Sequence, residues 1–402
     1  MKFSSLVNRI AGEGVDAWRI HSTALAAAAR GEDVIVLSVG DPDFATPEPI
    51  VDAAVRALRA GDTHYTVIPG RESLRQAIAQ QHVERCGQSV QSENVIVTSG
   101  AQNALFCAAQ CLCEAGDEVL VPEPMYLTYE ASIRASGATL VSVPVDADNH
   151  FRINLSTLQA AITPRTRAIF LATPCNPTGV VMRLGELQAV AKLAQAHDLW
   201  VVSDEVYSDL TFEQEHISIA ALPGIAERTV TISSLSKSHA MAGWRLGWAV
   251  APAPLITHME NLLLCMLYGI PGFVQEAALE AIAMRRVVVP AMRAEYRKRR
   301  DIAFRLLGDV PGLRCRLAEA GMFMLIDIRD TGMSAHDFTW GLFRQTGVSV
   351  LDALAFGPTA RGFLRLGFVV GEERLTEACQ RMAAYVNSVM QARETLAVRR
   401  QA

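Results

Sequence analysis

Two cations lie between two apolar segments of this 402-residue chain, and their placement limits how the chain can fold. Lys237 lies among the small hydroxyl residues of segment 233–238, and Arg245 follows eight positions later between tryptophans and glycines. Residues 228–232 and 246–250 have the apolar and β-branched character that is typical of strands. We therefore expect Lys237 on the connection between two core strands, where its amine is partly desolvated. Desolvation favours the neutral amine, which can attack a carbonyl carbon to form a Schiff base.

The groups around Lys237 are suited to an anion. The hydroxyls of Ser234 and Ser236 and the guanidinium of Arg245 supply hydrogen-bond donors of the kind that bind phosphate. The alternative is a solvated loop lysine beside a surface arginine. The flanking apolar residues count against that alternative.

Strands alternate with helices from about residue 49 to residue 290, which predicts an α/β fold with a doubly wound, mostly parallel sheet. Several residues follow predicted strands at the carboxyl ends, where such sheets bind ligands. They are Gly100, Ala101 and Gln102 after strand 94–98, Tyr126 after 118–121, Asn176 after 167–171, and Asp204 and Tyr207 after 199–203. The first three also begin a helix, whose free amides favour an anion. Strand, glycine and helix is nevertheless a common order in α/β proteins.

The stretch from Ser234 to Gly247 contains Ser-x-Ser-Lys followed by Met-x-Gly-Trp-Arg-x-Gly. It resembles the cofactor-lysine signature of class I aminotransferases, the fold type I enzymes that use pyridoxal 5′-phosphate (PLP). The resemblance runs almost the length of the chain. It implies a large PLP-binding domain with a mostly parallel sheet and a smaller α+β domain built from both termini. We expect residues 1–48 to form an N-terminal arm and part of the small domain, residues 49–290 the large domain, and residues 291–402 the small C-terminal domain.

The resemblance also implies how the cofactor is held. Lys237 would bond to PLP and move a proton, and Asp204 would keep the pyridine nitrogen protonated so that the ring accepts electrons. An Asp after a strand is often only a helix cap, which is the alternative for Asp204. Tyr207 would donate to the phenolic oxygen of the cofactor and complete the catalytic set. The other cofactor-binding residues implied are Gly100, Ala101, Gln102, Ser234 and Arg245 at the phosphate, Tyr126 stacked on the ring, and Asn176 at the phenolic oxygen.

Arg365 lies within the hydrophobic segment 362–368, and a buried arginine needs an anionic partner. A substrate α-carboxylate would fit, and a salt bridge to a distant carboxylate is the alternative. The resemblance favours the substrate and adds Gly40 and Asn176 to its binding site. It also implies that Tyr65 reaches the cofactor phosphate of a second subunit, which predicts a homodimer with shared active sites.

Composition limits the partners. The net charge of −5 and the isoelectric point near 6.0 argue against a nucleic-acid or anionic-membrane partner. No apolar run approaches the roughly 20 residues that span a bilayer, and Arg9, Glu13 and Asp16 leave no signal-peptide core. We therefore expect a cytoplasmic protein. The eight scattered cysteines form no Cys-x-x-Cys pair, so we expect no metal site, and we expect Cys175 to be a packing residue beside the active site.

The expected activity is transamination in two half-reactions, from an L-amino acid to the enzyme and then to a 2-oxo acid. Within the family, residues 40–44, 123–126, 236–241 and 260–269 are similar to those of arginine:pyruvate transaminases. A cationic substrate side chain would need an acidic wall in the binding site. Candidates for that wall are Asp41, Glu123, Glu130, Glu13 and Asp16.

The sequence leaves three alternatives open. The first is an aminotransferase with aspartate, alanine or an aromatic donor and 2-oxoglutarate as acceptor, although enzymes that prefer dicarboxylates tend to carry lysine where this chain has Gln102. The second is a PLP-dependent C–S β-lyase, which would use the same lysine and release pyruvate and ammonia. The third is a non-catalytic regulator of this fold. Such regulators usually carry a DNA-binding segment, and no helix-turn-helix pattern precedes the large domain.

Overall fold

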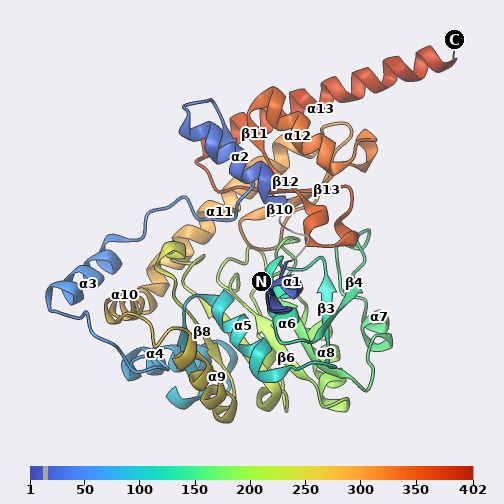
Figure 1. The fold of residues 1–402 in the computed structure, drawn as a ribbon. Coiled ribbons are helices and arrows are strands. Elements are labelled where there is room, and N and C mark those ends of the chain that lie inside the picture. The colour runs from blue at the N-terminus through green and yellow to red at the C-terminus, as the bar shows by residue number, and fades with distance from the viewer. Residues whose placement is uncertain (12–16, 402) are drawn as a thin grey trace.

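The structure, a computed structural model, describes residues 1–11 and 17–401 of the chain. Its main element is a seven-stranded sheet with helices on both faces (Figure 1). β8 runs antiparallel to its two neighbours, and the other strands are parallel to one another. The predicted α/β fold with a mostly parallel sheet is confirmed. In spatial order the strands are β2 (Val95–Thr98), β8 (Gly247–Val250), β7 (Thr229–Ser234), β6 (Trp200–Asp204), β5 (Thr166–Ala172), β3 (Glu118–Glu123) and β4 (Thr139–Pro144).

The central strands are buried on both faces, and successive residues pack into opposite helix layers, as the two-residue repeat of a strand requires. Ile169 and Val201 belong to one core cluster, whereas Phe170 and Val202 belong to another. One face is covered by α5 (Ala101–Leu112), α6 (Thr128–Ala135) and α9 (Ala253–Met266). The other is covered by α3 (Glu48–Arg59), α4 (Glu72–Cys86), α7 (Leu155–Ala160), α8 (Leu184–Ala196) and α10 (Gly272–Ala283).

A second, smaller unit is built around a four-stranded antiparallel sheet, in the upper part of Figure 1. Its strands are β12 (Leu351–Asp352), β13 (Phe363–Gly367), β10 (Phe323–Asp327) and β9 (Arg314–Cys315), beside the parallel pair β1 (Ile35–Val36) and β11 (Val348–Ser349). Its helices are α2 (Ala17–Ala29), α11 (Arg285–Leu307), α12 (Ala335–Thr346) and α13 (Glu372–Gln401). Leu37 from the N-terminal part packs in one core with Phe338 and Leu364. Both parts of the chain therefore build this unit, while the domain boundaries at residues 48 and 290 remain a prediction.

The segment that leads to Gly40 is less regular than its sequence suggests. Residues 34–39 have the pattern of one strand, but the strand β1 covers only two residues because its partner β11 is equally short. The backbone of Leu37 is still held on both sides: its amide donates to Ser349 O (2.9 Å), and Gly367 N donates to its carbonyl (2.9 Å). These bonds fix the direction in which the chain enters Gly40.

One helix boundary also differs from expectation. The sequence pattern predicts a helix over residues 261–268, whereas α9 begins at Ala253. Pro252 at the N-cap fixes a backbone angle suited to a helix start, and this local signal extends the helix by two turns.

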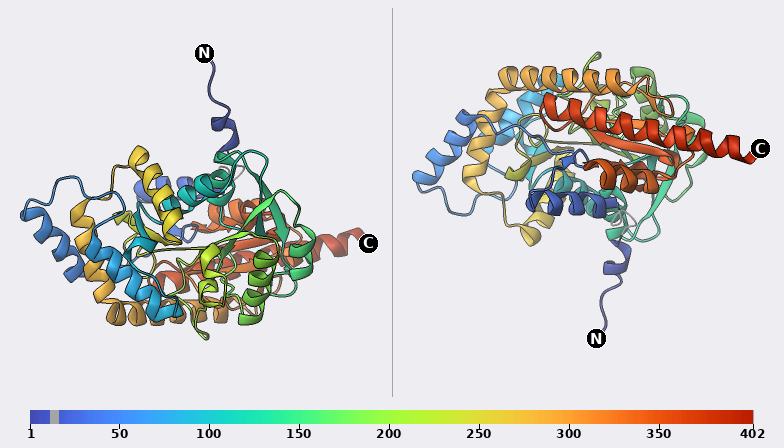
Figure 2. Two further views of the ribbon diagram at one scale, coloured as in Figure 1. Left: turned by 90° about the horizontal axis from the view of Figure 1, so that it is seen from below. Right: turned by 90° about the horizontal axis from the view of Figure 1, so that it is seen from above.

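Both chain ends lie at the outside of the molecule. Figure 2 shows α1 (Leu6–Arg9) at the edge of the body and the last turns of α13 extending beyond it. α1 is tied to the body through Arg9, whose Nε donates to Arg134 O (3.0 Å). Within the described ranges, none of the helices combines the length and the apolarity that crossing a membrane requires.

Gly247 lies where β2, β7 and β8 meet the start of α5. A substitution at this position tests how closely the strands pack against the helix. A Cβ atom there would lie 2.5 Å from Ala101 N and 2.6 Å from the carbonyl carbon of Gly100. We expect Gly247→Ala to lower the free energy of unfolding by about 1–3 kcal/mol through overpacking, seen as a lower melting temperature. Gly243→Ala is the matched control, because no atom lies within 4 Å of its Cβ position. Equal melting temperatures for the two variants would contradict the packing described.

Candidate active site

A cavity of about 300 Å³ lies at the carboxyl ends of the parallel strands, between the two units. Ala172, Asp204 and Ser234 line it, and they are the last residues of β5, β6 and β7. From the smaller unit, Arg365 of β13 reaches the same cavity. The predicted site residues that line the cavity are Gly40, Ala101, Gln102, Tyr126, Asn176, Asp204, Tyr207, Ser234, Lys237, Arg245 and Arg365.

Lys237 lies on the connection between β7 and β8, as its sequence context predicts. Its Nζ donates to Gly40 O (2.7 Å). Burial lowers the pKa of Lys237 to about 8; the carboxylate of Asp41 opposes this shift, and the guanidinium of Arg365 adds to it. With a pKa near 8, about a tenth of the amine is neutral at pH 7, far more than for an ordinary lysine. The amine is therefore available as a nucleophile and as a base.

Asp204 is a buried carboxylate at the end of β6. One oxygen accepts a hydrogen bond from the Tyr129 hydroxyl (2.8 Å), and the other accepts one from Val206 N (3.2 Å). Burial raises the pKa of Asp204 to about 6, although these two hydrogen bonds favour the ionised form. A cation placed beside Asp204 would gain a strong interaction, because little solvent screens the carboxylate. Sequence reasoning missed Tyr129, although its position on α6, three residues after Tyr126, places both rings near this carboxylate.

Arg365 is the corresponding buried cation, with only 3% of its surface exposed. It donates to Asn176 Oδ1 (3.1 Å) and to Ser38 O (3.0 Å), and its Nε has no hydrogen-bond partner. Among the described residues, no carboxylate forms an ion pair with it, so the alternative of a distant salt bridge is not observed. Burial lowers the pKa of Arg365 to about 10. This guanidinium is suited to a carboxylate that enters the cavity.

The start of α5 and Arg245 form a cradle for an anion. Gly100 is the N-cap residue, with φ 78°, and gives the helix no side-chain cap, so the first amides of α5 lack an intrahelical acceptor. A Cβ atom on Gly100 would lie 2.6 Å from Arg245 Nη2, so only glycine lets the guanidinium approach the helix end. The side chain of Gln102 accepts from Thr128 and donates to Ser132, so it is held against α6.

The remaining predicted residues differ in where they lie. Tyr207 is buried against Phe323 (5.3 Å between ring centroids), and burial raises its pKa above the ordinary value. Tyr65 does not line the cavity of its own chain; it is 84% exposed and lies against Tyr268 at the surface. Cys175 lines a small apolar cavity next to the main one, and burial raises its pKa, so its sulfur is held as a thiol.

The residues predicted as an acidic wall for a cationic side chain lie in different places. Asp41 lines the main cavity. Glu123 is buried and accepts from Thr359 N (2.6 Å), and Glu130 pairs with Arg134 (2.8 Å), so both are occupied elsewhere. Glu13 and Asp16 lie outside the described residues. Trp18, which sequence reasoning missed, lines the cavity as well.

The family model of aminotransferase classes I and II matches residues 32–382. The chain belongs to this family. It is therefore an aminotransferase, an enzyme that moves amino groups between amino acids and 2-oxo acids, as its sequence predicts, and enzymes of this class work with PLP.

Known proteins of the family resemble this aminotransferase closely. The arginine–pyruvate transaminase AruH of Pseudomonas aeruginosa is 53% identical over 383 residues, which cover 95% of this chain and 98% of AruH. The putative aminotransferase YugH of Bacillus subtilis is 38% identical over 361 residues, which cover 90% and 93% of the two chains. The solved structure of Thermus thermophilus aspartate aminotransferase with maleate superposes with a TM-score of 0.91 at 33% identity, covering 96% of this chain and 100% of that one.

Two buried arginines of the aminotransferase provide a test of the charge at Arg365. Arg365 has no carboxylate partner in the described part of the chain, whereas Arg300 is equally buried and pairs with Glu213 (2.6 Å) and Asp301 (2.7 Å). We expect Arg365→Met to leave the melting temperature unchanged or raise it, because it removes an uncompensated buried charge. Arg300→Met, the matched control, should lose about 1.5–3 kcal/mol of stability with its ionic hydrogen bonds. A larger loss for Arg365→Met, measured by calorimetry, would show that Arg365 is compensated within the fold.

Proposed function

We propose that this aminotransferase binds PLP in the cavity and moves the amino group of arginine to a 2-oxo acid such as pyruvate. The observation that carries the proposal is the convergence of three charged groups, the partly buried Lys237 and the buried Asp204 and Arg365, on one cavity. Each serves a different part of the reaction. No two of the three form an ion pair with each other in the described structure, so each is available to a bound molecule.

The residues around the cavity fit PLP at each of its ends. The cradle of Gly100, Ala101 and Arg245 is suited to the phosphate, with Ser234 as a further donor. At the opposite end, Asp204 would pair with the protonated ring nitrogen. This pairing would stabilise the ionised form of the Asp204 carboxyl group. The Tyr126 ring would stack on the cofactor, and Asn176 and Tyr207 would donate to its phenolic oxygen. Lys237 would hold the cofactor covalently through its amine.

When bound, PLP supplies an electron-accepting ring that weakens the bond between the substrate Cα and its hydrogen. Lys237 would act as the base once the substrate amine has taken its place on the cofactor: its freed Nζ would take up the proton that leaves Cα and later return it. Tyr129 holds the carboxylate of Asp204 in one orientation. Burial of Asp204 and Arg365 reduces solvent screening and strengthens their charge interactions.

Arg365 would bind the substrate α-carboxylate, assisted by Asn176 and by the backbone at Gly40. Its free Nε and its buried, charged guanidinium support this role. Arginine as donor and pyruvate as acceptor are supported by the 53% identity to AruH, well above the 33% identity to the aspartate aminotransferase structure. The side chain of Gln102 is bonded to α6, so the position offers no cation to a second substrate carboxylate.

A homodimer with shared active sites is part of the proposal. The side chains of a surface patch on α9 and two adjoining loops are apolar and exposed: Tyr65, Val67, Leu264, Met266, Leu267 and Tyr268. Thr66 Oγ1 donates to Ile270 O (2.8 Å), which holds the two loops together. A second copy of the chain would cover this patch and receive Tyr65 at its own cavity.

Turnover with arginine tests the proposed donor. We expect the purified PLP-loaded enzyme to form alanine from arginine and pyruvate faster than from aspartate or phenylalanine with pyruvate, measured by amino-acid chromatography. Lys237→Ala should reduce the rate at least a thousandfold, because the base is lost. Aspartate turnover above arginine turnover would refute the donor. Ammonia release from a cysteine-type substrate without a 2-oxo acid would indicate the lyase alternative, and no turnover of any substrate would indicate the regulator.

The dimer is tested at Leu267, which is 39% exposed in the surface patch. We expect Leu267→Asp to dissociate the dimer in sedimentation velocity, because a charge in an apolar interface is desolvated without a partner. Activity should fall with the dimer fraction, since each cavity would lose the partner's tyrosine. Leu184→Asp is the matched control: Leu184 is 45% exposed at the start of α8, on the opposite face of the sheet. A monomeric wild type with full activity would contradict the shared site.

A further inference from the structure

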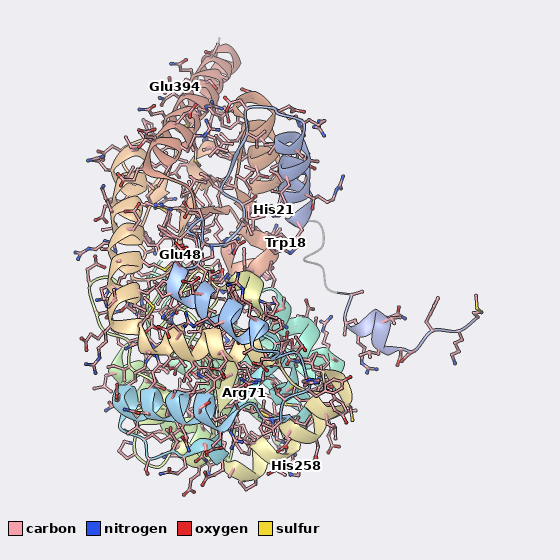
Figure 3. The ribbon with its side chains drawn as sticks, turned by 90° about the vertical axis from the view of Figure 1, so that its left-hand side faces the viewer. Trp18, His21, Glu48, Arg71, His258 and Glu394 are labelled. Carbon is pink, nitrogen blue, oxygen red and sulfur yellow. The ribbon has the colours of Figure 1, made fainter. Side chains whose placement is uncertain are left out.

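Trp18 and Asp41 form the outer wall of the active-site cavity. Both line the cavity that contains Lys237 and Arg365, and both are exposed, Trp18 by 38% of its surface. Trp18 comes from α2 and Asp41 from the loop that follows β1. Figure 3 shows Trp18 and His21 at the end of α2 nearest to the larger unit. Both side chains therefore lie on the solvent side of the cavity, and Asp41 directly follows Gly40, whose carbonyl accepts from Lys237 Nζ.

A short series of contacts fixes this wall relative to Arg365. Trp18 packs edge-on against His21, with 5.6 Å between ring centroids. His21 Nδ1 is hydrogen-bonded to Ser38 Oγ (3.0 Å), and Ser38 O accepts from Arg365 Nη2 (3.0 Å). Trp18 and Arg365 are thus linked through only two residues. These contacts hold Trp18 in a defined position relative to Arg365.

The charges of the cavity favour a cation at the outer wall. Arg365 makes the buried part of the cavity positive, Arg245 is an exposed cation at the anion cradle, and the buried carboxylate, Asp204, is bonded to Tyr129. Asp41 is the carboxylate of the outer wall, and in the described part of the chain it forms no ion pair. A neutral side chain would gain little from Asp41, and a carboxylate would be repelled. A guanidinium would gain both the charge of Asp41 and the face of an indole ring, on which it can stack.

We propose that Trp18 and Asp41 form a subsite that selects donors with a cationic side chain, and a guanidinium above all. The indole supplies a flat, electron-rich face, and the Asp41 carboxylate supplies the opposite charge. Arg365 holds the α-carboxylate at the other end of the same molecule. This subsite rests on the proposed function for its physiological donor, and its ligand chemistry is testable without turnover.

The test is the binding of 5-guanidinopentanoate to the PLP-loaded enzyme by calorimetry. This probe has a carboxylate and a guanidinium but no α-amino group, so it cannot react. Heptanoate, of similar length and without the cation, is the matched ligand. We expect Asp41→Asn to weaken 5-guanidinopentanoate about fivefold or more and Trp18→Leu to weaken it about three- to tenfold. Heptanoate affinity should change less than about twofold in both variants, because Arg365 is intact.

Conservative variants and an unrelated acid serve as controls. Asp41→Glu and Trp18→Phe should recover most of the affinity, because they restore the charge and the aromatic face. Asp52→Asn removes an exposed carboxylate from α3, outside the cavity lining, and should change neither ligand. Unchanged 5-guanidinopentanoate affinity in Asp41→Asn and Trp18→Leu would overturn the subsite, as would an equal loss of heptanoate affinity.

The same variants separate this proposal from the donor proposal. If wild-type enzyme does not turn over arginine while the guanidino probe still depends on Trp18 and Asp41, the donor is wrong and the subsite stands. If wild-type enzyme turns over arginine and both variants keep the same preference for arginine over norleucine, the donor stands and the subsite is overturned.

Discussion

The structure depends on three charged side chains that are largely removed from solvent and have no ion-pair partner among the residues that it describes. Lys237, Asp204 and Arg365 are each held in a largely desolvated place, and the pKa of each moves toward the neutral form, to about 8, 6 and 10. Arg300 shows the contrast: it is just as buried, yet its carboxylate partners raise its pKa despite the opposing effect of burial. The fold therefore tolerates unpaired charge at the cavity and compensates it elsewhere. Such grouping of shifted groups is characteristic of a site that receives charged ligands.

The sheet explains how these groups meet. Parallel neighbours place the ends of β6 and β7 side by side, which brings Asp204 and Ser234 to one edge. β8 then reverses direction and pairs with β7 and β2, so that Gly247 lies opposite both Ser234 and Thr98. This reversal carries Arg245 back to the start of α5, and the missing side chain of Gly247 lets the strand and the helix end come together. One antiparallel strand in a parallel sheet thus completes the anion cradle.

Most of the site could be predicted because its signals are local. Lys237, Asp204 and Asn176 each follow an apolar strand within a few residues, and Arg365 stands alone in an apolar run. Contacts between distant parts of the chain left no such signal. Tyr129 binds a carboxylate 75 positions away, and Trp18 is held at the cavity by the packing of α2 against β1, β11, β12 and α12 of the smaller unit. The length of β1 was likewise set by its partner β11 and not by its own β-branched residues.

The proposed binding mode has an electrostatic consequence for Lys237. In the free cavity, Asp41 raises the pKa of this lysine, while Arg365 lowers it. A donor carboxylate on Arg365 would offset the guanidinium and raise the pKa, which disfavours the neutral amine needed as a base. A cationic donor side chain at Asp41 would offset the negative charge of Asp41 and lower the pKa of Lys237 again. A donor with both charges therefore leaves the pKa of Lys237 close to its value in the free cavity. A donor with a neutral side chain raises this pKa and shifts the amine toward the protonated form. Selection of a cationic donor and readiness of the base would then have a common electrostatic origin.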